Sequence, residues 1–295
     1  MIADELLQGA IDLHVHGYPE ISSDVKTRLD DSEIVKVAKE SGMRGIVLKS
    51  HMWPTVGRAY HLQKQFPGFH VFPSITLNTT VGGLNPVSVE SAARQGAKVI
   101  YMPTWSSSND LRQGGFSTYM KTYLNSLRNL TPEHGLELLT EEGYLKEEVN
   151  EILQIARFYK LAIATGHIAI KESMALIEEA NRLEVWPIIY NHPDSRSVGA
   201  TRTQIKMMSE KGAFVEICAI GMMPAFQRIH PREVIEIVKD IGAEKCVLST
   251  DFFFDWAPPV PEMLRMTMGT LLSFGLSPEE IRLMVQINPA KILRL

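Results

Sequence analysis

Short apolar runs rich in β-branched residues alternate along the chain with longer stretches in which apolar positions recur at helical spacing. Eight of these runs predict strands, and most are almost continuously hydrophobic, as expected for parallel strands that are covered on both faces. The predicted strands cover residues 10–16, 45–51, 69–75, 97–103, 161–167, 185–192, 213–219 and 245–251.

Helix start signals fall between these strands. Capping boxes begin at residues 30 and 201, and a proline follows the predicted cap at residues 85, 230, 277 and 288. Eight strands, each followed by a helix, predict a (β/α)8 TIM barrel with extra C-terminal helices. An open doubly wound sheet is the rival, because periodicity does not show closure. No composition break interrupts residues 1–295, which favours a single domain.

One connection is longer than the others. Residues 103–146 separate the fourth strand from the next predicted helix, and their first half is rich in Ser, Asn, Gly and Tyr. A long excursion within a compact fold is typical of a functional lid or of a decorating insertion. We favour a lid-like insertion, with a small hairpin in its second half.

Composition narrows the function classes. The chain has 295 residues, 45% hydrophobic and 22% charged, with a net charge of -4 and a pI of about 6.2. This mild acidity argues against a nucleic-acid partner. No apolar run is long enough to predict a membrane span, the first residues do not resemble a secretory signal, and two cysteines do not make a disulfide framework. We therefore expect a cytoplasmic protein with a small-molecule substrate; a homo-oligomer stays open.

Chemistry-bearing residues gather where the predicted strands end. The first strand ends with His14 and His16, the second with Lys49 and His51, and the fifth, sixth and eighth end with His167, His192 and Asp251. Active sites of (β/α)8 barrels lie at this C-terminal edge. His14 and His16 are two positions apart on a strand and so face the same side, where they can bind one cation. Five imidazoles and a carboxylate predict a divalent metal, most simply zinc, with manganese or iron as alternatives.

With these pieces in place, the sequence resembles the amidohydrolase superfamily of metal-dependent hydrolases. The matching segments are "DLHVH", "TGH", "NHPD", "STDF" and "NPAKIL", in the order of the family and over nearly the whole chain. The resemblance implies that His14, His16, His167 and His192 bind metal. It also implies that Asp251 is both a ligand and the proton acceptor.

One departure concerns lysine. Family members with two metals often carry a carboxylated lysine at the end of strand four, but here that strand ends "YMPTW". Lys49 offers three alternatives: a cation that holds an anionic substrate group beside one metal, a carbamate that bridges two metals, or a side chain that only reaches solvent. The sequence therefore leaves one or two ions open.

The leading hypothesis is a hydrolase of a small amide, lactone or ester that uses a metal-activated water. Asp251 would act as general base and then general acid, His192 would polarise the carbonyl, and Lys49 would bind substrate. Two alternatives stay open: a metal-dependent decarboxylase of an aromatic or related acid, and a non-catalytic metal-binding barrel. Glu216 could face the strand ends or the barrel wall. Aromatic residues just past strand ends could line a substrate pocket or pack the loops: Trp53, Trp105, Phe252, Phe253 and Trp256.

Overall fold

The structure is a computed structural model that describes residues 2–123 and 135–295. The chain divides into two compact units, each of which is described by itself. Unit 1 comprises Met1–Lys49, Thr55–Pro73 and Val215–Leu295, and unit 2 comprises Ser50–Pro54 and Ser74–Phe214.

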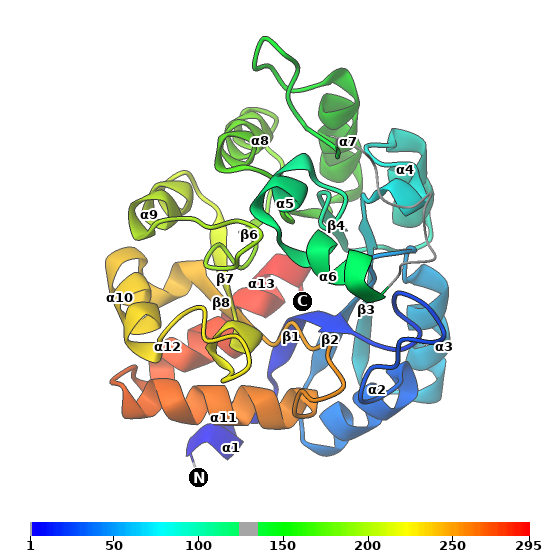
Figure 1. The fold of residues 1–295 in the computed structure, drawn as a ribbon. Coiled ribbons are helices and arrows are strands. Elements are labelled where there is room, and N and C mark those ends of the chain that lie inside the picture. The colour runs from blue at the N-terminus through cyan, green and yellow to red at the C-terminus, as the bar shows by residue number, and fades with distance from the viewer. Residues whose placement is uncertain (1, 124–134) are drawn as a thin grey trace. The chain divides into compact units, whose positions relative to one another are not determined.

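Eight strands form one sheet within the described residues, in the order β1 to β8 (Figure 1). They are β1 (Ile11–His16), β2 (Gly45–Lys49), β3 (His70–Thr76), β4 (Val99–Tyr101), β5 (Ala162–Ala164), β6 (Ile188–Tyr190), β7 (Phe214–Cys218) and β8 (Cys246–Ser249). Neighbouring strands pair in parallel, as between β1 and β2 and between β7 and β8 in unit 1, and between β4 and β5 in unit 2. All eight predicted strands are confirmed, with small differences at their ends.

The two ends of the strand order meet within unit 1. The backbone N–H of Asp251, just past β8, donates to the carbonyl of His14 at 3.0 Å, and the N–H of His16 donates to the carbonyl of Phe252 at 2.9 Å. These bonds place β8 beside β1, which an open doubly wound sheet does not do. The fold class is therefore the predicted (β/α)8 barrel.

Helices follow the strands in both units. They are α1 (Ile2–Leu7), α2 (Asp31–Glu40), α3 (Val56–Gln65), α4 (Pro86–Arg94), α5 (Ser108–Gln113), α6 (Phe116–Tyr123), α7 (Glu147–Tyr159), α8 (Ile170–Arg182), α9 (Arg202–Glu210), α10 (Pro231–Ile241), α11 (Val260–Ser273), α12 (Pro278–Arg282) and α13 (Asn288–Leu293). Short 3-10 turns are η1 (Thr79–Val81), η2 (Ala219–Met222) and η3 (Ala243–Lys245), and η4 (Leu283–Ile287) is a π-helical turn.

The sequence located most helix starts correctly. Complete capping boxes open α2 and α9, and Asn85 and His230 cap α4 and α10 ahead of a proline. The last helix differs from the prediction, because α12 runs through η4 into α13 without a break. Asn288 instead donates from its side chain to the carbonyls of Ala243 and Cys246, at 2.8 and 2.6 Å. The Asn-Pro pair therefore fixes this turn to the strand-eight region rather than starting a separate helix.

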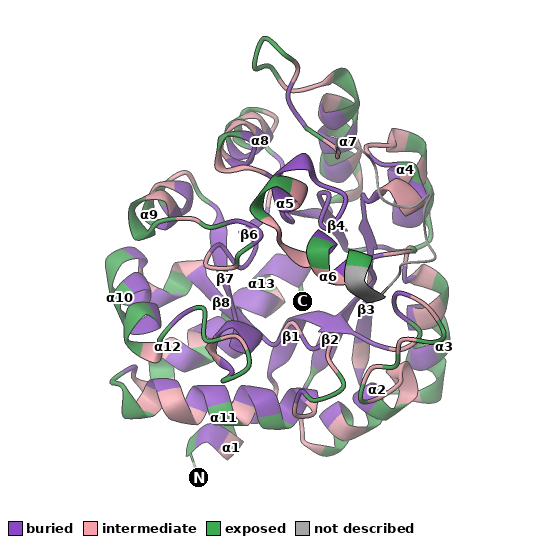
Figure 2. Cartoon of the chain, in the orientation of Figure 1, coloured by how far each residue is buried: buried purple, intermediate pink, exposed green. Residues whose placement is uncertain are grey.

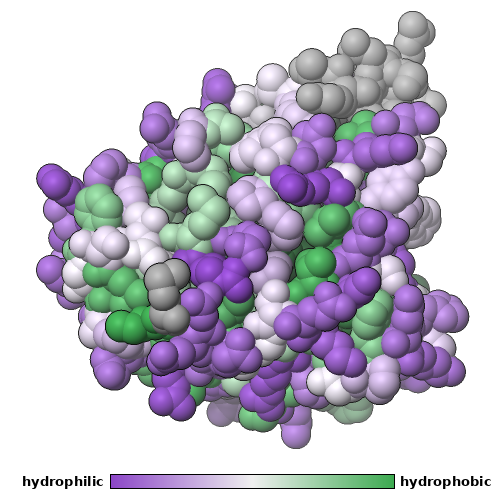
Figure 3. Space-filling model, turned by 90° about the horizontal axis from the view of Figure 1, so that it is seen from below, coloured by the Kyte–Doolittle hydropathy of each residue, from purple (hydrophilic) through white to green (hydrophobic). Residues whose placement is uncertain are grey.

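Burial explains how the elements pack. The strands are buried throughout most of their length, and helices such as α10 and α11 have one buried and one exposed side (Figure 2). In unit 1, α1 packs against α11 (Figure 1). Figure 3 shows hydrophilic residues interspersed with smaller hydrophobic groups among the coloured residues of the face seen from below. None of the described helices is both long enough and apolar enough to cross a bilayer.

The segment 103–146 is structured wherever the structure describes it. It begins with the buried Trp105, continues through α5 and α6, and returns through the parallel bridge between Ser107 and Leu136. An antiparallel bridge between Leu139 and Leu145 forms the small hairpin expected in its second half. Residues 124–134 of the predicted lid lie outside the described residues, and a lid role stays a prediction.

Candidate functional site

Two histidines and an aspartate meet where β1 and β8 end in unit 1. His14 and His16 are fully buried, with ring centroids 5.2 Å apart. Oδ1 of Asp251 lies 3.1 Å from Nε2 of His14 and 3.5 Å from Nε2 of His16, and this aspartate side chain keeps 25% exposure. Two nitrogens and one oxygen therefore gather around one partly accessible point.

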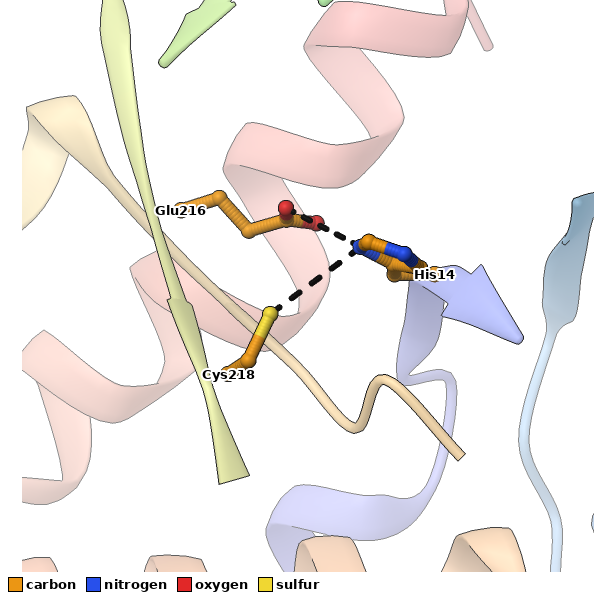
Figure 4. Close-up of side chains that lie close together, drawn as sticks. All are labelled: His14, Glu216 and Cys218. Carbon is orange, nitrogen blue, oxygen red and sulfur yellow. Dashed lines mark hydrogen bonds and ion pairs between the residues drawn. The ribbon is translucent and has the colours of Figure 1, made fainter. Parts of the chain in front are cut away.

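A second carboxylate lies behind each of these rings. Nδ1 of His14 is 3.1 Å from Oε2 of Glu216, and Nδ1 of His16 is 3.2 Å from Oε1 of Glu20. Figure 4 shows Glu216 reaching from β7 to the His14 ring on β1. A carboxylate accepts hydrogen bonds, so each Nδ1 can donate its proton to the carboxylate behind it, and in a neutral ring the Nε2 lone pair is then available to a cation bound beside Asp251. Metal-binding histidines in proteins are held in this way.

The charges around the rings act in opposite directions. Burial lowers the pKa of His14, with Lys49 adding to the effect. Burial also opposes protonation of His16, but hydrogen bonds to Asp251 and Glu20 outweigh it and raise the pKa of His16. Carboxylates thus favour positive charge beside His16, as they would favour a bound cation.

Lys49 reaches the same cluster. Its side chain is buried, and Nζ lies 2.9 Å from Nε2 of His14. Burial lowers the pKa of Lys49, which favours the neutral amine. The amine does not reach solvent, so of the three alternatives for Lys49 the solvent-directed one does not fit the structure.

Hydrogen bonds to the buried side chain of Asp12 join β1 to the residue after β8. Asp12 accepts hydrogen bonds from the N–H of His14 at 2.9 Å and from the hydroxyl of Thr250 at 2.5 Å, and burial raises the pKa of Asp12 to about 7. Asp251 follows Thr250 with φ of 54°, in the left-handed region that non-glycine residues rarely adopt. The hydrogen bonds of Asp12 and this turn set the direction of the Asp251 side chain.

Cys218 and Cys246 are both buried free thiols. Sγ of Cys218 lies 4.0 Å from Nδ1 of His14, beside Glu216 on the same strand (Figure 4). Glu216 is the nearer of the two at 3.1 Å and accepts the Nδ1 proton, so Cys218 packs against the ring.

Unit 2 holds the remaining predicted ligands. His167 and His192 follow β5 and β6, with rings in a T-shaped contact at 4.9 Å between centroids. Nδ1 of His167 lies 2.6 Å from Oδ2 of Asp110, and Nδ1 of His192 lies 3.2 Å from the hydroxyl of Ser195. His51 lies past the end of β2, and its ring stacks on Phe116 at 4.6 Å.

Asn78 organises the loop that carries His51. Its amide donates to the carbonyl of His51 at 3.0 Å and to the hydroxyl of Thr104 at 2.7 Å. Its side-chain oxygen accepts from the N–H of Thr104 at 2.9 Å and from the hydroxyl of Ser106 at 2.8 Å. One buried amide thereby ties the residues after β2 to those after β4 within unit 2.

Aromatic side chains lead from His16 toward the surface of unit 1. Phe253 contacts the His16 ring edge-on at 5.7 Å, Phe254 contacts Phe253 at 4.9 Å, and Trp256 stacks on Phe254 at 5.3 Å. Trp256 is 41% exposed. Among the aromatic residues noted in the sequence, Trp105 and Phe252 are fully buried, so some of this group pack loops and others face outward.

Sequence reasoning missed the supporting carboxylates. Glu20 lies four residues after His16, and Asp110 lies in the insertion, far along the chain from His167. Neither spacing is a motif, and the sequence allows Glu216 to face either the strand ends or the barrel wall. The available signal was physical: a buried metal-binding imidazole needs an acceptor for its second nitrogen.

The donor set of unit 1 fits a divalent transition metal. Zinc binds imidazole nitrogen and carboxylate oxygen at about 2.0–2.2 Å, which puts two tetrahedral donors roughly 3.4 Å apart. The separations of Asp251 Oδ1 from the two histidine nitrogens, 3.1 and 3.5 Å, match that spacing. The chemistry of these residues is therefore suited to such an ion.

Comparisons with known proteins agree with this fold. The model of a family of unknown function, DUF6282, matches residues 9–216, and no curated protein sequence is significantly similar to the chain. Among solved structures, an amidohydrolase from Pseudomonas aeruginosa is similar with a TM-score of 0.69 at 12% identity, covering 99% of this chain and 98% of that one.

Two further structures are similar over almost their whole length. A probable 2-pyrone-4,6-dicarboxylic acid hydrolase from Acinetobacter baumannii has a TM-score of 0.61 at 12% identity, with 98% and 100% of the two chains covered. A 2,6-dihydroxybenzoate decarboxylase from Rhizobium has a TM-score of 0.60 at 9% identity, with 97% and 99% covered. At these identities the likeness shows a shared fold.

Proposed function

Because the chain belongs to the DUF6282 family and has the barrel fold of amidohydrolase-superfamily structures, we propose that it is a metal-dependent hydrolase of a small-molecule amide, lactone or ester. The observation that carries the proposal is the pair of carboxylate-backed histidines, His14 and His16, whose Nε2 atoms both face Asp251. In neutral rings held in this way, both Nε2 lone pairs can bind one ion beside Asp251.

The proposed metal ligands in unit 1 are His14, His16 and Asp251, and those in unit 2 are His51, His167 and His192. When bound, a divalent ion such as zinc supplies Lewis-acid chemistry, lowering the pKa of water and polarising a carbonyl. Glu20 and Glu216 hold the Nδ1 protons of His16 and His14 during the reaction. This keeps both rings in one tautomer.

Asp251 takes the acid–base role in the proposal. Its carboxylate is partly exposed, while the surrounding histidines are buried, so it is the member of the unit 1 cluster that water can approach. It accepts a proton from the attacking water and returns it to the leaving group. His192 orients the substrate carbonyl, and its Nδ1 contact with Ser195 supports that orientation. Lys49, whose Nζ lies 2.9 Å from Nε2 of His14, binds an anionic group of the substrate as a hydrogen-bond donor.

A decarboxylase of an aromatic acid is the second candidate. The aromatic series Phe253, Phe254 and Trp256 favours it, because a planar ring stacks on such side chains. A similar fold occurs in a decarboxylase of a dihydroxybenzoate. The absence of a lysine at the end of β4 is the second point in its favour.

A paired assay separates the two candidates. Metal-supplied protein is incubated with panels of lactones, amides and esters and with aromatic carboxylic acids, while acid release and carbon dioxide release are measured together. The hydrolase proposal predicts acid release that is lost in His16→Ala. Carbon dioxide release alone would establish the decarboxylase. Metal-loaded protein that is inactive toward both panels, with metal binding intact, would favour a non-catalytic metal-binding barrel.

A further inference from the structure

The first helix of the 103–146 insertion, α5, and its N-cap residue form hydrogen bonds with the loop that carries His167. The side chains of Ser107 and Asn109 donate to the backbone carbonyl of His167 at 3.1 and 3.0 Å. Asn109 also donates to the carbonyl of Ser197, at 2.8 Å, in the loop after β6. These bonds run from side chains of the insertion to backbone carbonyls and would suffice to hold the insertion in place.

Asp110 makes a different contact, to the imidazole itself. Its fully buried carboxylate places Oδ2 2.6 Å from Nδ1 of His167. We propose that Asp110 is a positioning residue that fixes the tautomer and direction of the His167 ring for metal binding. The inference rests on the proposed function, in which His167 is a ligand, and it gives the insertion a role in building the metal centre.

The surroundings of Asp110 require a carboxylate. Oδ1 accepts from the N–H of Ser117 at 2.7 Å, and Oδ2 accepts from the N–H of Phe116 at 3.1 Å as well as from His167. Both oxygens therefore face donors. An asparagine at this position would point its NH2 group at a donor in either orientation, so the amide is no substitute for the acid.

The contact decides which histidine nitrogen is free. With Asp110 accepting from Nδ1–H, Nε2 of His167 keeps its lone pair for a metal. An amide NH2 directed at Nδ1 would make that atom the acceptor and move the ring proton to Nε2, which blocks coordination. A merely structural carboxylate would not produce this exchange.

Gly115 gives a second way to disturb the carboxylate. A Cβ added there would lie 2.6 Å from Oδ2 of Asp110 and 2.5 Å from the hydroxyl of Ser197. Gly115→Ala therefore pushes on the oxygen that holds His167 without changing any ionisable group. The matched control is Glu137→Gln, because Glu137 accepts from Ser108 and Arg112 of the same helix and does not contact His167.

The test measures zinc affinity by chelator competition and the His167 tautomer by ¹⁵N NMR of histidine-labelled, metal-free full-length protein. Asp110→Asn is expected to weaken zinc binding by about 10- to 100-fold and to move the ring proton from Nδ1 to Nε2. Gly115→Ala should shift affinity in the same direction by a smaller factor, and Glu137→Gln should match wild type. Urea midpoints check that each variant is folded.

Two outcomes separate this inference from the proposed function. Wild-type tautomer and zinc affinity in folded Asp110→Asn would overturn the positioning role while leaving the metal centre intact. Equal zinc binding by wild type and His167→Gln would instead remove His167 from the ligand set. In that case the tautomer comparison still decides whether Asp110 fixes the ring.

Discussion

An imidazole offers a metal one lone pair, and the group on its other nitrogen decides which one. Three of the predicted ligand histidines have a carboxylate at Nδ1: Glu216 for His14, Glu20 for His16 and Asp110 for His167. At each of these histidines the carboxylate can accept the Nδ1 proton, which makes Nε2 the nitrogen that would bind a metal. The repetition of one arrangement at three histidines is stronger support for a metal centre than any single distance.

Replacing Asp251 by asparagine tests the acid–base role. Asparagine tolerates the positive φ of 54°, so the fold and the backbone bond to His14 should survive. Turnover on a verified substrate should fall by about 10²–10⁴, the range for a positioned general acid or base, with a smaller change in KM. Asp255→Asn, the same change at an exposed site four residues on, is the control. Near-full turnover in Asp251→Asn would remove the aspartate from the mechanism.

Lys49→Met tests whether the lysine bridges metals. Nζ of Lys49 contacts Nε2 of His14, the same nitrogen that faces Asp251. An ion bound to this nitrogen must therefore displace the amine. We expect one metal per chain in both wild type and Lys49→Met, with no effect of bicarbonate during loading. A fall from two metals to one, measured by elemental analysis, would instead identify Lys49 as a bridging carbamate.

At the scale of elements, the sequence predicted what local chemistry determines. Strand positions followed from hydrophobic runs, and the caps at Asp30 and Thr201 from side chains that satisfy the first N–H groups of a helix. The paths of the loops that follow the strands could not be predicted from the sequence. Asn78 contacts the loop after β2 and the loop after β4 through one amide, and no periodicity encodes such a long-range contact.

Asn78 should therefore matter more to stability than an ordinary cap. Asn78→Ala leaves the buried N–H of Thr104 without its acceptor and should lower the free energy of unfolding by about 2–4 kcal/mol, since each stranded buried group costs roughly 1–3 kcal/mol. Asn85→Ala removes only the N-cap of α4 and should cost about 1 kcal/mol. Urea unfolding compares the two variants, and equal midpoints would contradict a special role for Asn78.

The contacts that the 103–146 insertion makes within unit 2 show that its start and its return are firmly packed. Trp105 and Asp110 are buried, and the backbone N–H of Leu138 donates a hydrogen bond to the Glu172 carboxylate at 2.7 Å. A lid role predicts that limited proteolysis cuts within residues 103–146 first and that an active-site ligand slows the cut. The same cleavage rate with and without ligand would favour a decorating insertion.

At the scale of the whole molecule, fold class and candidate ligands followed from where hydrophobic runs end, because a parallel barrel collects its chemistry at one edge. The fold is shared with hydrolases and with a decarboxylase, so it leaves the reaction open. Substrate choice depends on loop side chains such as Trp256, whose exposure no sequence pattern fixes. Metal binding is therefore the property that the fold class and the candidate ligands predict most directly.

Metal content tests that property in the intact protein. The unit 1 cluster places the carboxylates of Asp251, Glu216 and Glu20 next to two histidines. An ion that binds only the folded chain should therefore stabilise it, by about 4 kcal/mol at a thousandfold excess over its Kd. Zinc, manganese or iron should be present near stoichiometrically, and chelation should lower Tm by several degrees. His14→Ala combined with His16→Ala should lose most of the metal and the chelator response, whereas His61→Ala, on α3, should keep both. Folded, metal-supplemented wild type that contains no metal and has an unchanged Tm would refute the metal centre.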